Sequence, residues 1–117
     1  MPSKSSDWRI RIRHILDAIA ENQNYIGGKS YDQFCEDTKT LKAVVWNLTI
    51  IGEAARHIPP SVEATCPEIP WPQIRGMRNR IVHGYERIDW EIVWKAVQDE
   101  LPPLVPLFEK LLRTAPD

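Results

Sequence analysis

Side chains suited to acid–base and anion chemistry gather in the stretch RNRIVHGY, residues 78–85. Arg78 carries a planar, permanently charged guanidinium, which matches phosphate oxygens and stabilises the extra negative charge of a phosphoryl transition state. His83 takes or gives a proton near neutral pH without a metal, as a general acid or base does. Asn79 adds an amide and Tyr85 a hydroxyl, so this set of residue types predicts chemistry on a phosphate.

The spacing of the two central residues does not bring them together on one helix face. Arg78 and His83 are five residues apart, which separates them by about 140° on an ideal helix. Two arrangements remain open: the helix ends at His83 and Gly84 turns the histidine back, or a twofold mate brings two copies across one groove. The structural alternatives are an ion pair of Arg78 with Glu53 and an ordinary helix-end histidine.

Charge limits the kind of nucleic-acid site that this chain can carry. The net charge is −1 and the isoelectric point is near 6.3, so binding by a general basic surplus is excluded. Any such site is local, and Arg75, Arg80 and Arg87 are its auxiliary RNA-binding candidates. Cys35 and Cys66 fit no zinc spacing and are predicted to be reduced thiols of a cytoplasmic protein. We predict no metal, no cofactor and no membrane segment.

Apolar periodicity predicts the elements that position these residues. An amphipathic helix ends before Gly27 and Gly28, and Ser30 with Gln33 forms a capping box for a short turn. The sequence predicts three later helices, from Thr38 or Thr40 to about Ile58, from Pro72 to about His83, and from an Asp89 cap to Leu101 with a kink or a new helix after Pro102. Residues 1–117 therefore form one all-α domain, an up-and-down bundle of four to five helices.

The helix between Thr38 and Ile58 is apolar on two sides. Its first face comprises Leu41, Val44, Val45, Leu48, Gly52 and Ala55, and its second comprises Ala43, Trp46, Ile50 and Ala54. A helix that is apolar on both sides lies at the centre of its own bundle or is shared with another chain. In so small a domain we expect a shared helix, and hence a homodimer.

Longer phrases around the polar stretch resemble a known family. RNRIVHGY fits the pattern of arginine, four residues, histidine, any residue and tyrosine that marks the HEPN superfamily. The phrases IGEAA (51–55), PEIPW (67–71) and GMRNRIVHGY (76–85) are similar to HepT-type toxins. The resemblance implies a HEPN-like homodimer that is a metal-independent endoribonuclease, with Arg78, His83 and the assisting Asn79 in the dimer groove and the RNA 2′-hydroxyl as nucleophile.

The same resemblance implies a regulatory partner. Toxins of these type VII systems are encoded beside a minimal nucleotidyltransferase antitoxin, MntA-like, which silences them by AMPylation of the motif tyrosine, here Tyr85. Two other hypotheses remain. One is a non-catalytic HEPN domain that binds a nucleotide or a nucleotidyltransferase subunit at the same groove, and the other is a helical scaffold whose polar joint only solvates a turn.

Overall fold

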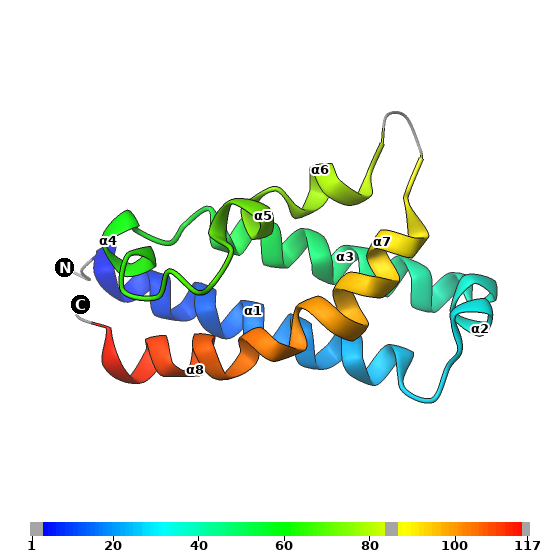
Figure 1. Cartoon of the computed structure of the whole chain (residues 1–117), viewed down its shortest axis with the longest axis horizontal. Coiled ribbons are helices and arrows are strands. Elements are labelled where there is room, and N and C mark those ends of the chain that lie inside the picture. Colours follow the sequence, from blue (N-terminus) through cyan, green and yellow to red (C-terminus); the bar gives the residue numbers. More distant parts are fainter. Residues whose placement is uncertain (1–3, 84–86, 116–117) are drawn as a thin grey trace.

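The computed structural model describes residues 4–83 and 87–115 of the chain (Figure 1). Helix α1 spans Lys4–Ile26 and α3 spans Thr38–Ala55; they run antiparallel and pack along their length. Between them, α2 covers Tyr31–Glu36. The described residues contain no β-strand apart from one isolated bridge, so the predicted all-α class is confirmed. No helix among them is long and apolar enough to cross a membrane.

The second half of the chain consists of shorter helical pieces. Helix α3 ends at Ala55, slightly before the predicted end near Ile58, and the segment after it contains a short helix, α4 at Pro60–Glu63. Helix α5 covers Trp71–Arg75 and α6 covers Met77–Ile81, and both pack on α3. The predicted helix after Asp89 begins as α7, Trp90–Lys95, and continues as a π-helical turn, η1, at Ala96–Glu100.

The chain then bends at its prolines, as predicted, and returns along α1. A 3₁₀ turn, η2, covers Pro102–Leu104, because neither proline supplies an amide to continue the preceding helix. Helix α8, Val105–Thr114, lies antiparallel to α1 (Figure 1). Arg9 of α1 donates to the carbonyl oxygens of Leu112 and Ala115, which satisfies acceptors at the end of α8. These hydrogen bonds connect the start of the first helix to the end of the last one.

One apolar core joins the long helices, and the stripe predicted for α1 lies in it. Trp8, Ile12 and Ile15 are fully buried, as is Phe108 of α8. The core side of α3 contributes Val44, Leu48, Ile51 and Ala55. Ala54, predicted on the second face of α3, is also buried. Both cysteines are free.

The second face of α3 is only partly covered. Trp46 is 65% exposed, which is far above any other tryptophan described here. Ala43 and Ile50 beside it are half-buried. Covering an exposed tryptophan removes apolar surface from water and so lowers the free energy.

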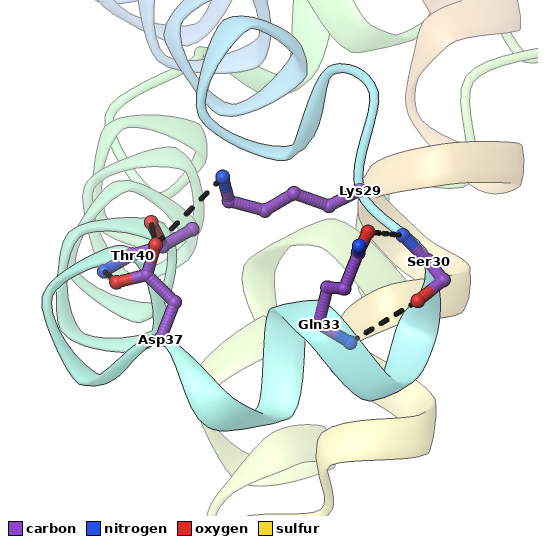
Figure 2. A network of polar contacts seen from close by, with 5 residues as sticks. All are labelled: Lys29, Ser30, Gln33, Asp37 and Thr40. Carbon is purple, nitrogen blue, oxygen red and sulfur yellow. Dashed lines mark hydrogen bonds and ion pairs between the residues drawn. The ribbon is translucent and has the colours of Figure 1, made fainter.

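Two short polar networks define where α2 and α3 begin (Figure 2). The predicted capping box is present: the Gln33 amide donates to Ser30 Oγ over 3.2 Å, and the Ser30 amide donates to Gln33 Oε1 over 2.8 Å. Asp37 caps α3, accepting from the amide and from the hydroxyl of Thr40, and lies 3.7 Å from Lys29 Nζ. These caps satisfy amides that have no partner inside their helices.

The Asp37 cap makes the stability of the fold depend on pH. The Thr40 hydroxyl and amide, with Lys29, hold the pKa of the Asp37 carboxyl below its ordinary value of 3.8. A lowered pKa gives stability that is present above pH 3.8 and is lost as pH falls through the folded-state value. Asp37→Ala should therefore lower the melting temperature at pH 7, and by less at pH 3, in thermal denaturation followed by circular dichroism.

Glu109, an exposed carboxylate on α8, provides the matched control. Glu109→Ala should leave the melting temperature nearly unchanged at both pH values. A deficit for Asp37→Ala that stayed constant from pH 7 to pH 3 would show that the ionised cap is not its cause.

Candidate active site

The helix that carries the polar stretch is short and ends earlier than predicted. The single helix expected from Pro72 to about His83 is divided at Gly76, and α6 stops at Ile81. Val82 adopts an extended conformation, with φ −104° and ψ 111°. His83 therefore lies outside the helix, so it does not share a helix face with Asn79, four residues earlier.

Backbone pairing of residues 81–83 with residues 87–89 explains this ending. Val82 and Ile88 form the antiparallel bridge, the His83 amide donates to the Arg87 carbonyl over 2.6 Å, and the Asp89 amide donates to the Ile81 carbonyl over 2.8 Å. The Val82 amide still donates to the Arg78 carbonyl over 2.9 Å, so the new partners replace the helical hydrogen bonds of the His83 amide and the Ile81 carbonyl alone. His83 and Arg87 are thus fixed opposite each other. Gly84 and Tyr85 lie outside the described residues, so the turn conformation predicted for Gly84 falls there too.

His83 stands in an open cleft of about 510 Å³. This histidine cleft is lined by Tyr31, His83, Arg87, Ile88, Asp89, Trp90 and Glu91. The His83 side chain is 54% exposed, and its Nε2 lies 4.0 Å from Asp89 Oδ2. The other Asp89 oxygen caps α7, as predicted, by accepting from the Ile92 amide over 3.1 Å. Asp89 is thereby held in place beside the His83 imidazole.

The far wall of the histidine cleft is held by aromatic packing. Phe34 of α2 contacts Trp90 and Trp94 of α7, with ring centroids 6.1 and 5.1 Å apart. The Cys35 side chain, by hydrogen bonding, and burial raise the pKa of Tyr31 to about 12. Tyr31 consequently presents a neutral hydroxyl to the cleft at physiological pH.

Arg78 and Asn79 line a different hollow, to which His83 does not contribute. This arginine hollow, of about 80 Å³, is lined by Thr49, Gly52, Glu53, Arg56, Arg75, Arg78 and Asn79. Gly52 is what allows α5 and α6 to approach α3 here, because a Cβ at this position would lie 3.3 Å from the Ile74 carbonyl oxygen and 3.4 Å from Met77 Cβ.

The predicted ion pair between Arg78 and Glu53 does not form. Glu53 Oε1 instead lies 3.9 Å from Nε2 of His57, one turn along α3. No carboxylate among the described residues pairs with Arg78, whose side chain is exposed. Its guanidinium is therefore available for an anion.

The three auxiliary arginines have different surroundings. Arg75 lines the arginine hollow but is paired with Glu63. Arg80 lies 3.1 Å from Glu100 and lines a separate hollow beside η1. Arg87 is exposed in the histidine cleft. A paired guanidinium offers less net positive charge to RNA, so Arg87 is the best placed of the three.

A third hollow connects the other two. This tryptophan groove, of about 330 Å³, is lined by Thr38, Leu41, Lys42, Val45, Trp46, Thr49, Ile88 and Trp90. It shares Thr49 with the arginine hollow and shares Ile88 and Trp90 with the histidine cleft. Within one chain, Arg78 and His83 therefore line two different pockets, each of which shares lining residues with the tryptophan groove.

Sequence reasoning missed Arg56 and the second role of Asp89. Arg56 follows Gly52 by one helical turn, and that spacing could have placed it beside whatever packs on the glycine. Asp89 was recognised only as a cap. Its position opposite His83 follows from the antiparallel pairing, which is a tertiary feature. The described residues contain no cluster of His, Cys, Asp and Glu that could hold a metal ion.

The all-helical domain matches a family model of ribonucleases. The match extends through most of the chain, because the family model described as "Ribonuclease HepT-like" covers residues 15–111. The chain belongs to the HepT-like family.

Named relatives agree with this assignment. The chain is 36% identical over 100 residues to a protein of Thermococcus cleftensis named "Probable ribonuclease HepT", with 86% of this chain and 91% of the relative covered. It is 30% identical over 113 residues to a provisionally named RNase of Methanocaldococcus jannaschii, with 97% and 92% covered. A second such protein from that organism is 35% identical over 90 residues, with 77% and 83% covered. No solved structure matches the chain significantly.

Proposed function

We propose that this protein is a metal-independent endoribonuclease that acts as the toxin of a type VII HEPN/MNT toxin–antitoxin system. The observation that carries the proposal is an unpaired Arg78 and an exposed His83 in two pockets that each share lining residues with the tryptophan groove of α3. Family membership and the RNase names of relatives support the activity.

The chemistry uses the RNA's own hydroxyl. His83 accepts the 2′-hydroxyl proton, the 2′-oxygen attacks the adjacent phosphorus, and the bond to the 5′-oxygen of the next nucleotide breaks. The leaving oxygen takes up a proton, and the products carry a 2′,3′-cyclic phosphate and a 5′-hydroxyl. Arg78, assisted by Asn79, stabilises the charge that builds on the phosphate oxygens. DNA lacks the attacking hydroxyl and is not cut by this route.

The direct test is cleavage of end-labelled single-stranded RNA in the presence of a chelator. We expect fragments that end in a 2′,3′-cyclic phosphate, and no cleavage of a DNA strand of the same sequence. Tight binding of RNA or of a nucleotide with no turnover would instead favour the non-catalytic HEPN domain. The histidine cleft, of about 510 Å³, has the size of an ordinary small-ligand site.

A homodimer would bring the arginine hollow of one chain to the histidine cleft of the other. The arginine hollow lies on the Thr49–Arg56 half of α3, while the tryptophan groove lies on the Thr38–Thr49 half. A twofold axis across the middle of α3 sets each half against the other half of its partner. Arg78 then faces His83 of the partner subunit across one groove.

The exposed Trp46 is the expected centre of this interface. Trp46→Glu should raise the dissociation constant of the dimer by roughly 30-fold or more, because the loss of a tryptophan hot spot costs about 2 kcal/mol. Light scattering over a range of protein concentrations measures the change, and circular dichroism shows that the helices remain. Lys110→Glu, on the exposed side of α8, should leave the dimer intact. A Trp46→Glu protein that stayed dimeric would rule out this interface.

The proposed antitoxin is a minimal, MntA-like nucleotidyltransferase that AMPylates Tyr85. This residue lies in sequence between His83 and Arg87, both of which line the histidine cleft. An AMP phosphate on Tyr85 would add negative charge where RNA phosphates bind. Intact mass after co-expression with the adjacent gene should show an AMP increment that Tyr85→Phe abolishes. An unmodified wild-type chain that is nevertheless silenced would contradict this mechanism.

A further inference from the structure

The arginine hollow contains a second guanidinium that the family motif does not include. Arg56 is the C-cap residue that follows α3, whereas Arg78 belongs to α6, yet both line the same space. No carboxylate among the described residues pairs with Arg56, and its side chain is exposed. Two unpaired arginines from two parts of the chain therefore line one small hollow.

The neighbouring carboxylates only partly balance these two arginines. Arg75 is paired with Glu63. Glu53 also lines the hollow, with its Oε1 3.9 Å from His57 Nε2, so one carboxylate there faces two unpaired guanidiniums. Like charges that share a hollow repel one another, so Arg56 and Arg78 raise each other's free energy until an anion enters. The hollow is thus arranged to receive negative charge.

Size decides which anion fits. The hollow offers about 80 Å³, which is room for roughly three water molecules at about 30 Å³ each. Small-molecule sites need about 300 Å³ or more, so neither a nucleobase nor a whole nucleotide is accommodated. A single phosphate group is of the right size, and a guanidinium binds phosphate oxygens through two parallel hydrogen bonds.

Gly52 shows that the convergence depends on close packing of the two elements. Its missing side chain lets the Ile74 carbonyl and Met77 come against α3, as described above. Arg56 follows Gly52 by four residues and Arg78 follows Met77, so this contact brings both arginines to one hollow. The tryptophan groove meets the hollow at Thr49, so a strand lying in the groove brings a backbone phosphate to its edge.

We propose that Arg56 and Arg78 together bind one backbone phosphate of the RNA in the arginine hollow, with Arg56 as a substrate-binding residue outside the motif. This inference rests on the proposed ribonuclease function for the identity of the ligand. It adds to that function a second phosphate-binding arginine, from the C-cap of α3, and assigns the arginine hollow as the phosphate site.

Binding of a non-cleavable strand tests the inference separately from catalysis. The probe is a single-stranded RNA with 2′-O-methyl groups throughout, which the full-length protein cannot cut through the 2′-oxygen. Its affinity is measured by fluorescence anisotropy at several salt concentrations for wild type, Arg56→Gln, Arg56→Lys and Arg113→Gln. Arg113 is an exposed arginine in the last turn of α8 and serves as the matched control.

We expect Arg56→Gln to weaken binding about tenfold, because a charge-assisted hydrogen-bond pair is lost. The slope of log affinity against log salt should become shallower by about 0.7, the value for one phosphate contact on a single strand. Arg56→Lys should keep the wild-type slope with part of the affinity, since it retains charge without the planar fork. Arg113→Gln should match wild type in both quantities.

Two results would overturn the inference: an Arg56→Gln protein with wild-type affinity and slope, or equal losses in Arg56→Gln and Arg113→Gln. Cleavage of unmodified RNA by the wild type is scored in parallel. If the wild type cuts RNA and Arg56→Gln behaves as wild type, only the inference fails. If the wild type never cuts RNA but the Arg56 slope change is present, the ribonuclease function fails and the phosphate site stands.

Discussion

His83→Ala should reduce RNA cleavage by roughly 10²- to 10⁴-fold, the usual contribution of a positioned general acid or base. Histidine is the side-chain type that exchanges protons near neutral pH. The other residues that line the histidine cleft are a tyrosine whose pKa is raised to about 12, an arginine, two carboxylates and apolar side chains. None of these replaces the imidazole, so initial rates on end-labelled RNA should fall to the background of the Arg78→Ala protein.

The fold should tolerate the change, which keeps the result interpretable. The His83 side chain is 54% exposed, and its backbone amide, not its ring, makes the hydrogen bond to Arg87. Circular dichroism and the dimer's hydrodynamic size should therefore match the wild type. His14→Ala removes an exposed histidine on α1 and should cleave normally. Near-normal cleavage by His83→Ala would remove the basis of the proposed mechanism.

Local sequence signals predicted the helices well because each signal acts over a few residues. Apolar periodicity predicted α1 and α3, and the Ser30 box and the Asp89 cap are present as expected. The prolines after Leu101 end a helix because they lack an amide. In each case the cause is contained in the segment itself, so no tertiary information was needed.

The end of α6 could not be predicted in the same way. Residues 78–83 contain no proline or glycine, and nothing in their own propensities stops a helix at Ile81. The chain leaves the helix because the His83 amide and the Ile81 carbonyl find partners on Arg87 and Asp89. Tertiary pairing overrode a local preference. The same limit hid Arg56, because only the packing of α6 against Gly52 brings it near Arg78.

The sequence alone predicted which residue types form the candidate site, but it did not predict that they line two separate pockets. Arg78 and Asn79 share a hollow with Arg75, and His83 shares a cleft with Arg87, but the two groups are separated by the tryptophan groove. A motif written on one line of sequence suggests a single cluster. The ending of α6 separates it into two halves, and this division is the reason for proposing a site shared by two chains.

Mixing two inactive variants should restore activity if each site takes Arg78 from one chain and His83 from the other. An Arg78→Ala chain keeps its histidine, and a His83→Ala chain keeps its arginine, so their heterodimer contains one intact site and one doubly defective site. Random pairing makes half of the dimers mixed, each with one working site of two, so about a quarter of wild-type cleavage should return. The measurement is the initial rate after the two variants are unfolded and refolded together.

The mixture distinguishes the two arrangements that the motif spacing leaves open. If each site took both residues from one chain, every site in the mixed dimer would lack one of them, and the rate would stay at the level of the single variants. Introducing Trp46→Glu into both chains should abolish the recovered rate, because the composite site exists only in the dimer. Recovery that persisted at dilutions where light scattering shows monomers would contradict the shared site. Recovery that follows the dimer fraction would place the reacting phosphate between the two copies of α3.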